Sequence, residues 1–258
     1  MQDIRFIDTH SHLYDEAFAG EEDLAAARAV EAGVSKMIVP DIDSVTRAGM
    51  FALTERHPGT LFPTLGLHPT SVNADWKSEI DRMMEFDGKD ICAIGEVGID
   101  CYWSKEFLAE QKEVMRLMLE MAHERSLPVI IHSRDASEPI LEILKQCRHL
   151  DLRGVFHAFS GSIETYREIQ KLGDWSVGIG GVLTFKKASI AETVKQIPLE
   201  KILLETDSPY LTPAPHRGKR NESAYIPLIA ARLAELKEIE IAQVAEQTTQ
   251  NAEKLFGI

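Results

Sequence analysis

Short apolar runs alternate with longer segments of helical spacing along almost the whole chain, and this alternation constrains the fold more than any other feature. Eight apolar runs have the length of buried strands, and they lie at residues 4–8, 36–40, 61–65, 91–96, 128–132, 154–157, 175–178 and 201–205. Helical spacing occurs, for example, at residues 21–32, 45–57, 105–125, 137–148, 165–172, 225–238 and 240–256. Strands that alternate with helices pair in parallel, and eight such units predict a closed (β/α)8 barrel of the TIM type.

An open, doubly wound sheet is the alternative architecture. Its usual mark is a glycine-rich turn after the first strand, but residues 8–12 contain no glycine. The chain has 258 residues, 44% of them hydrophobic, which suits one barrel-sized core. The longest polar, turn-rich stretch, residues 212–223, lies between periodic segments rather than between two cores. We therefore expect a single domain that spans residues 1–258.

The start of the chain lacks the charged region, apolar stretch and small-residue cleavage site of a signal peptide. No run of about 18 apolar residues occurs in the sequence, so we expect no membrane span. Cys92, Cys101 and Cys147 share no metal-type spacing, and we interpret them as reduced thiols. These observations favour a cytoplasmic protein, and no obligate protein partner is evident.

The formal net charge of -13 limits the kinds of partner that the chain can bind. Proteins that grip a long duplex usually carry a broad basic stripe, because neutralising phosphates supplies most of their non-specific affinity. Here basic residues gather only in one loop, as His216, Arg217, Lys219 and Arg220. The charge excludes a DNA-coating protein but not an enzyme that contacts a few phosphates through metal ions and local cations.

Side chains that can bind metal ions recur where the expected strands end. The carboxyl ends of barrel strands converge on one face, where catalysis is normally found. Random placement would scatter such residues over helices and the opposite face. The candidate metal ligands at these ends are His10, His12, Glu96, His132, His157 and Asp207.

His10 and His12 lie two residues apart directly after the first expected strand. Because side chains alternate along a strand, both imidazoles would point the same way, together with Asp8, and could bind one cation. Glu96 lies in an apolar run, where an ionised carboxylate needs compensation. A metal ion or the backbone amides of the surrounding glycine turn would each supply it.

Six ligands are too many for one tetrahedral ion but suit a bridged pair. The division we favour gives one ion His10, His12 and Asp207, gives the other His132 and His157, and places Glu96 between the two. We expect two divalent metal ions, and the ligand set admits Mg²⁺, Mn²⁺ or Zn²⁺. This arrangement suits hydrolysis of phosphodiesters, phosphoesters or amides, and the ligands do not choose among them. Asp207, with Glu205 beside it, would accept or relay the proton of the attacking water.

The motifs resemble those of the TatD family of metal-dependent deoxyribonucleases, within the amidohydrolase-like barrels. They follow one another in the family's order: FIDTHSH at residues 6–12, GLHP at 66–69, IGEVGID at 94–100, PVIIHSR at 128–134, HAFSG at 157–161, GIGG at 178–181, LETDSPYL at 204–211 and RNE at 220–222. The resemblance implies a metal-dependent 3′-to-5′ exonuclease that acts on single-stranded DNA. It also implies that the six residues above are the metal ligands.

The resemblance further implies that His68, Arg134 and Asn221 bind substrate. From the residues alone, His68 is equally well a structural imidazole that caps the turn before Pro69, and Arg134 could pair with Asp135. The family commonly follows its Arg-Asn-Glu motif with proline, whereas this chain has Ser223.

Aromatic residues also follow the fourth expected strand. Tyr102 and Trp103 could stack on a base or pack against the barrel rim.

Two other functions remain open. An amidohydrolase acting on a cyclic amide or lactone often bridges its metals with a modified lysine on the fourth strand, but no lysine occurs between Asp90 and Tyr102. A non-catalytic metal-binding barrel would keep all six ligands only for stability. Metal-dependent turnover separates this last reading from the enzymes.

Overall fold

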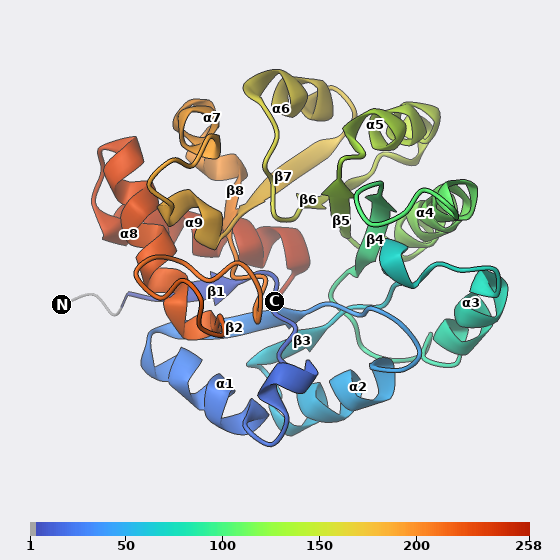
Figure 1. Cartoon of the computed structure of the whole chain (residues 1–258), viewed down its shortest axis with the longest axis horizontal. Coiled ribbons are helices and arrows are strands. Elements are labelled where there is room, and N and C mark those ends of the chain that lie inside the picture. Colours follow the sequence, from blue (N-terminus) through green and yellow to red (C-terminus); the bar gives the residue numbers. More distant parts are fainter. Residues whose placement is uncertain (1–3) are drawn as a thin grey trace.

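Parallel strands form the centre of the fold, and helices surround them (Figure 1). The computed structural model describes residues 4–258. The expectation that no signal peptide begins the chain partly concerns residues 1–3, which lie outside the described residues. The strands are β1 (Phe6–Asp8), β2 (Val34–Val39), β3 (Leu61–Pro63), β4 (Ile94–Asp100), β5 (Val129–Arg134), β6 (Arg153–Phe156), β7 (Asp174–Ile179) and β8 (Ile202–Leu204).

The strands form two hydrogen-bonded sheets, β1-β2-β3 and β4-β5-β6-β7-β8, and all their pairings are parallel. Backbone bonds join the sheets at both edges. Gly95 N donates to Leu65 O at 2.9 Å, and Thr9 N donates to Leu204 O at 3.0 Å. These seams close the barrel and confirm the (β/α)8 architecture that the alternating pattern predicts.

Helices follow the strands on the outside of the barrel. Two of them, α3 and α7, come in addition to the seven helical segments named from the sequence. The helices are α1 (Glu22–Glu31), α2 (Arg47–Arg56), α3 (Trp76–Met84), α4 (Leu108–Arg125), α5 (Ser137–Gln146), α6 (Ile163–Gln170), α7 (Ile190–Gln196), α8 (Ile226–Lys237) and α9 (Ile241–Phe256). None of the helices within residues 4–258 combines the length and apolar character that a membrane crossing requires.

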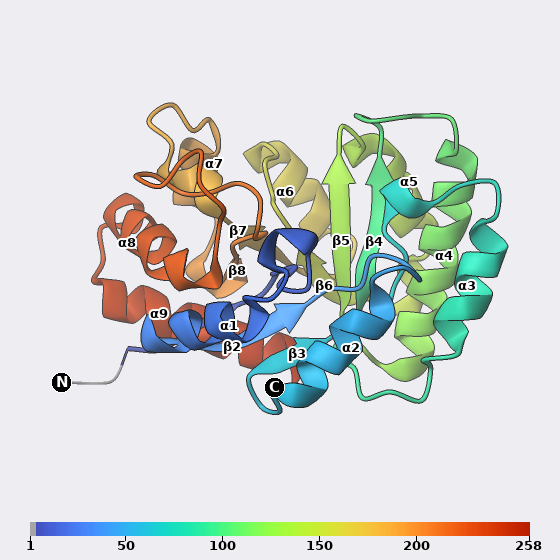
Figure 2. The same ribbon diagram turned by 60° about the horizontal axis from the view of Figure 1, so that its bottom comes forward.

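The last helix, α9, packs against one end of the barrel. Its Leu255 and Phe256 join a buried cluster with strand residues that include Ile7, Ile130 and Leu203. Figure 2 shows α9 at the opposite end of the barrel from the arrowheads of β4 and β5. The end of the barrel away from α9 therefore remains for a functional site.

Two strands are longer than the sequence predicts. β4 was expected to end at Glu96 and β5 at His132, but they continue to Asp100 and Arg134 and stay paired to that point. The missing side chain of Gly98 permits this close pairing, because a Cβ there would lie 2.0 Å from the carbonyl oxygen of His132. Glu96 and His132 therefore project from within strands rather than from their ends.

Candidate metal centre

The six candidate ligands come together at the carboxyl ends of the strands. His10 and His12 follow β1, Asp207 follows β8, and His157 follows β6 directly. The other two project from within β4 and β5. His10, His12, Glu96 and His157 are buried, with exposures of 5% or less.

One group of ligand atoms gathers on the β1 side of the centre, and we call it the first ligand group. His10 Nε2 lies 3.1 Å from His12 Nε2 and 3.0 Å from Glu96 Oε2. Asp207 Oδ1 lies 3.7 Å from His10 Nε2 and 3.6 Å from His12 Nε2. Four ligands about 2.1 Å from one tetrahedral ion would lie about 3.4 Å from each other, so these spacings fit a single cation.

A second ligand group gathers around the other oxygen of Glu96. Glu96 Oε1 lies 2.9 Å from His132 Nδ1 and 2.8 Å from His157 Nε2. His68 belongs to the same group, because its Nε2 lies 3.3 Å from Glu96 Oε1 and 3.3 Å from His132 Nδ1. From the sequence, His68 was expected either as a substrate contact or as a cap of the turn before Pro69. Its Nδ1 does accept from Thr70 N at 3.1 Å and caps that turn, while its Nε2 faces the second ligand group, which the sequence did not indicate.

Glu96 thus faces both groups, one with each carboxylate oxygen. Burial raises the pKa of this carboxyl, but the charges of His157, His68 and His10 hold it well below its usual range. For His157, burial lowers the pKa, but the Glu96 carboxylate has the larger effect and raises the pKa to about 10. His10 shows the opposite result, because burial lowers its pKa to about 4. Buried carboxylates here require positive charge, which divalent ions would supply in place of protons.

The first ligand group is held by bonds across the seam between β1 and β8. Asp8 is fully buried, and its carboxylate accepts from the backbone N of His10 at 3.2 Å and of Thr206 at 2.9 Å. It also accepts from the Thr206 hydroxyl at 2.6 Å. Asp207 N donates to His10 O at 2.9 Å, which ties the two ligand-bearing segments together.

Asn221 supports the same seam through the loop that carries Asp207. Its side chain is fully buried, and its amide donates to the carbonyls of Thr206 at 2.8 Å and Tyr210 at 2.6 Å. Its oxygen accepts from Glu222 N at 2.9 Å. This placement favours a role in holding the loop of Asp207 over the direct substrate contact that the sequence suggested.

The second ligand group depends on one further carboxylate, Asp100. Its Oδ2 lies 3.1 Å from His132 Nε2, and its Oδ1 accepts from the backbone N of Tyr102 and Trp103 at 2.9 and 3.1 Å. Such a partner fixes the orientation of a ligating imidazole. Sequence reasoning missed Asp100, although strand alternation places it on the same side of β4 as Glu96.

Glu205 lies behind His157. It is buried, it accepts from Ala158 N at 2.6 Å, and its Oε1 lies 3.8 Å from His157 Nδ1. A Cβ at Gly178 would lie 1.9 Å from Glu205 Oε2, so a glycine is required for this carboxylate to fit. Burial raises the pKa of Glu205 to about 8. Its contacts with the backbone and His157 suit a positioning role.

Arg134 forms a platform with the aromatic pair that the sequence singled out. Its guanidinium lies 4.0 Å from the ring centre of Tyr102 and 5.3 Å from that of Trp103. Tyr102 and Trp103 are 55% and 69% exposed, so neither is packed away against the rim. We call Tyr102, Trp103 and Arg134 the aromatic platform.

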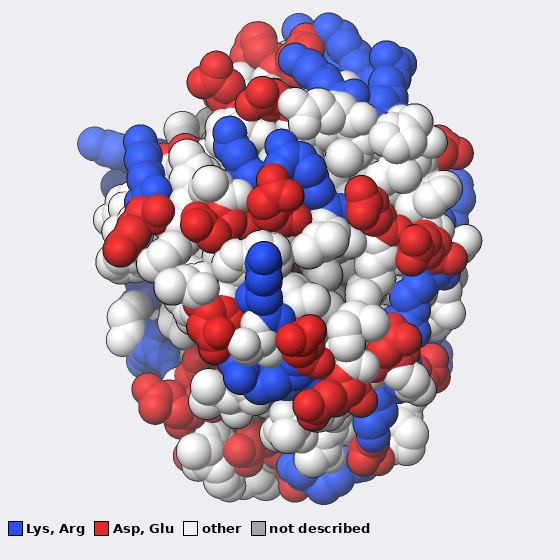
Figure 3. Space-filling view, turned by 90° about the vertical axis from the view of Figure 1, so that its right-hand side faces the viewer, with Lys and Arg blue, Asp and Glu red and all other residues white. Residues whose placement is uncertain are grey.

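The basic cluster of the loop after β8 divides into two parts. Arg220 is committed to the protein, because it bonds Ala17 O at 2.7 Å and Glu21 at 2.8 Å. Arg217 instead lies over the ring of Phe185 at 4.2 Å, and the exposed Lys186 and Lys187 follow Phe185 in the chain. Figure 3 shows the face that lies on the right in Figure 1. Acidic and basic side chains are mixed over this face, and it has no broad basic area.

Comparison with known proteins supports a metal-dependent hydrolase. The family profile described as "TatD related DNase" matches residues 7–257. "Uncharacterized metal-dependent hydrolase YabD" of Bacillus subtilis (strain 168) is 37% identical over 253 residues, which cover 97% of this chain and 98% of that protein.

Solved structures show the same relationship. The crystal structure of YjjV, a TatD homologue from Escherichia coli K12, superposes with a TM-score of 0.89 at 30% identity and 100% coverage of both chains. A TatD-family hydrolase from Entamoeba histolytica superposes with a TM-score of 0.83 at 23% identity, over 99% of both chains, and shows the shared fold. This chain belongs to the TatD family of metal-dependent hydrolases.

Proposed function

We propose that the protein hydrolyses phosphodiester bonds as a 3′-to-5′ exodeoxyribonuclease that acts on single-stranded DNA with two divalent metal ions. The observation that carries this proposal is the Glu96 carboxylate, which faces one ligand group with each oxygen. A carboxylate placed in this way suits two neighbouring cations, the arrangement common in phosphodiester hydrolysis. The description of the matching family as DNase supports the same substrate.

Each ligand group would hold one ion. His10, His12 and Asp207 would bind the first ion, and His132, His157 and His68 would bind the second, with Glu96 shared. When bound, such ions stabilise charge on phosphate oxygens and lower the pKa of water. The mixture of nitrogen and oxygen ligands is compatible with Mg²⁺, Mn²⁺ or Zn²⁺.

Asp207 is the residue best placed to accept a proton from the attacking water. Its side chain is 16% exposed, whereas that of Glu96 is 1% exposed. Burial raises the pKa of Asp207, but the hydrogen bond with His12 and the charge of His157 lower it below its usual value, which keeps the carboxylate ionised. Glu205 would support this step indirectly by holding His157.

DNA would meet few protein cations, in keeping with the net charge of -13. Arg134 follows His132 of the second ligand group by two residues, and its guanidinium suits a phosphate contact. Tyr102 and Trp103 beside it offer ring faces on which unpaired bases can stack. Stacking requires bases free of a duplex, which favours single strands.

The test is an assay of protein reconstituted separately with Mg²⁺, Mn²⁺ and Zn²⁺. Single-stranded DNA, duplex DNA and RNA of one sequence, labelled at the 5′ end, should give a ladder of shortened products fastest with single-stranded DNA. The Asp207→Ala and His132→Ala variants should fold and show no hydrolysis. Turnover of a cyclic amide such as dihydroorotate, without release of nucleotides, would instead establish an amidohydrolase. Bound metal without any turnover would establish a non-catalytic barrel.

A further inference from the structure

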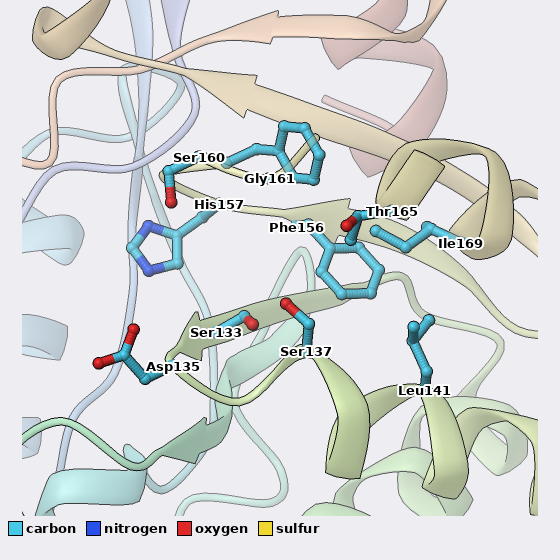
Figure 4. A pocket seen from close by; sticks show the side chains of 11 residues that line it. Ser133, Asp135, Ser137, Leu141, Phe156, His157, Ser160, Gly161, Thr165 and Ile169 are labelled. Atoms are coloured by element: carbon cyan, nitrogen blue, oxygen red, sulfur yellow. The ribbon is translucent and has the colours of Figure 1, made fainter. Parts of the chain in front are cut away.

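A cavity of about 220 Å³ lies between α5 and α6 and reaches the metal centre at His157 (Figure 4). We call it the α5–α6 pocket. His157, Asp135 and Ser160 lie at one end of this pocket, and Leu141 and Ile169 lie at the other. Its volume is below the ~300–1,000 Å³ typical of sites for drug-sized ligands, so it suits a smaller group.

The end near His157 is polar and uncommitted. Among the described residues, the side chains of Ser133, Asp135 and Ser160 take part in no hydrogen bond or ion pair of the protein. These groups are therefore available to a bound molecule. No lysine or arginine lines the pocket within residues 4–258, and the Asp135 carboxylate disfavours an anion there.

The far end of the pocket combines apolar side chains with hydroxyl groups. Phe156, Leu141 and Ile169 lie there beside Thr165, and Phe159 also lines the pocket. Phe159 is 9% exposed, and Phe156 is 4% exposed. Aromatic and aliphatic walls interrupted by hydroxyl groups suit a flat ring that carries hydrogen-bonding atoms on its edge.

The chain around Arg134 separates charge between two sides of the metal centre. Arg134 points toward β4, where its guanidinium lies over Tyr102. Its neighbours Ser133 and Asp135 line the pocket on the other side, toward β6. A cation and a carboxylate thus flank the centre on opposite sides. An extended nucleic acid would place its phosphates toward Arg134 and an uncharged group toward Asp135.

We propose that the α5–α6 pocket binds the base of the 3′-terminal nucleotide while the adjoining phosphodiester lies at the metal centre. This inference rests on the proposed nuclease function. The polar end would contact hydrogen-bonding atoms of the base or sugar, and the apolar walls would cover the ring. The pocket then determines which terminal residue is removed efficiently, independently of the aromatic platform that contacts bases farther along the strand.

The first experiment compares two single-stranded oligonucleotides that differ only at the 3′-terminal residue, which carries a base in one and is abasic in the other. The value of kcat/KM should be about 10- to 100-fold lower for the abasic substrate, the range expected when contacts to one base are lost. Equal values would overturn the pocket while leaving the nuclease function intact. Failure to hydrolyse either DNA would contradict the nuclease function itself, and the inference would fall with it.

The second experiment fills the pocket. Ser137 lines the cavity and is exposed at the start of α5, so Ser137→Phe adds bulk without disturbing the core. This variant should lower kcat/KM about 10-fold or more for the ordinary substrate and leave the abasic substrate unchanged. Glu138→Phe, one residue farther along and outside the pocket lining, is the matched control and should behave like the unaltered protein. Equal loss on both substrates with Ser137→Phe would contradict the inference.

A binding measurement gives a readout without turnover. The inactive Asp207→Ala variant is titrated with an oligonucleotide whose 3′-terminal base is fluorescent 2-aminopurine. Fluorescence should change on binding, and Ser137→Phe in the same background should remove most of that change. The same change in both proteins would place the terminal base outside the pocket.

Discussion

The two ligand groups of the metal centre are held in different ways. The first group, with His10, His12 and Asp207, depends on backbone bonds and a buried carboxylate across the seam where the barrel closes. The second group depends on carboxylate side chains behind its imidazoles, with Asp100 behind His132 and Glu205 behind His157.

This difference separates stability from metal binding. Bonds that hold the first group also join the first strand to the last, so a change there affects folding and ligand placement together. The bond from Asp100 orients the imidazole of His132 on β5, and β5 is paired with β4 and β6 independently of that bond. We therefore expect substitutions behind the first group to destabilise the protein, and substitutions behind the second to weaken the site alone.

Glu96→Gln should have the largest effect, because it alters the one residue that both groups share. The amide keeps a single oxygen, so one group loses its carboxylate ligand. Metal-dependent turnover should fall by more than about 1,000-fold, beyond the ~10–100-fold typical of outer-shell partners. Calorimetric titration should also show fewer bound metal ions per chain.

The control for this variant is Glu192→Gln, which changes a carboxylate on α7 that is 77% exposed. It should keep full turnover and the original number of bound ions. Unchanged turnover in Glu96→Gln itself would contradict the shared-ligand arrangement.

Asp8→Ala should have the next largest effect and should act on stability. It removes an acceptor of three hydrogen bonds and leaves buried donors on His10 and Thr206 without partners. We expect a loss of about 3 kcal/mol in the free energy of unfolding, measured in urea with metal-free protein. Asp8→Asn retains an acceptor oxygen and should cost about 1 kcal/mol. Equal stability of Asp8→Ala and the unaltered protein would show that the seam does not depend on this carboxylate.

Asp100→Asn should have a smaller effect and should act on the second ligand group. The amide can still accept from the turn at Tyr102, but it gives His132 a neutral partner in place of a charged one. Metal affinity should fall about 10- to 100-fold, while the free energy of unfolding of the metal-free protein changes by less than about 1 kcal/mol. A loss of stability as large as that of Asp8→Ala would erase the distinction between the two groups.

The sequence predicted the parts of this centre that follow from periodicity. Strand-helix alternation located the barrel, and strand ends brought His10, His157 and Asp207 to one face. It placed Glu96 and His132 at the ends of their strands, which was wrong, because Gly98 lets β4 and β5 continue side by side. A glycine in an apolar run does not by itself distinguish a turn from a close strand pairing.

Long-range contacts were beyond the reach of sequence reasoning. His68 joins the second ligand group only because its loop folds over Glu96. Asn221 lies in a motif that resembles a substrate contact, yet burial commits its amide to Thr206 and Tyr210. Both outcomes depend on which side of a loop turns inward, and local residue patterns do not specify that.

Tyr14→Phe should have the smallest effect and tests whether the first group also needs a side-chain partner. The Tyr14 hydroxyl lies 3.2 Å from His12 Nδ1 and donates to Pro40 O at 2.5 Å. His12 is already placed by the bond of its backbone N to Ser208 O at 2.8 Å, so losing the hydroxyl leaves the ring free to rotate but not to move away. Metal affinity should therefore fall by less than about 10-fold, below the effect of Asp100→Asn. A loss equal to that of Asp100→Asn, measured in the same calorimetric titration, would mean that ring orientation rather than backbone position limits both ligand groups.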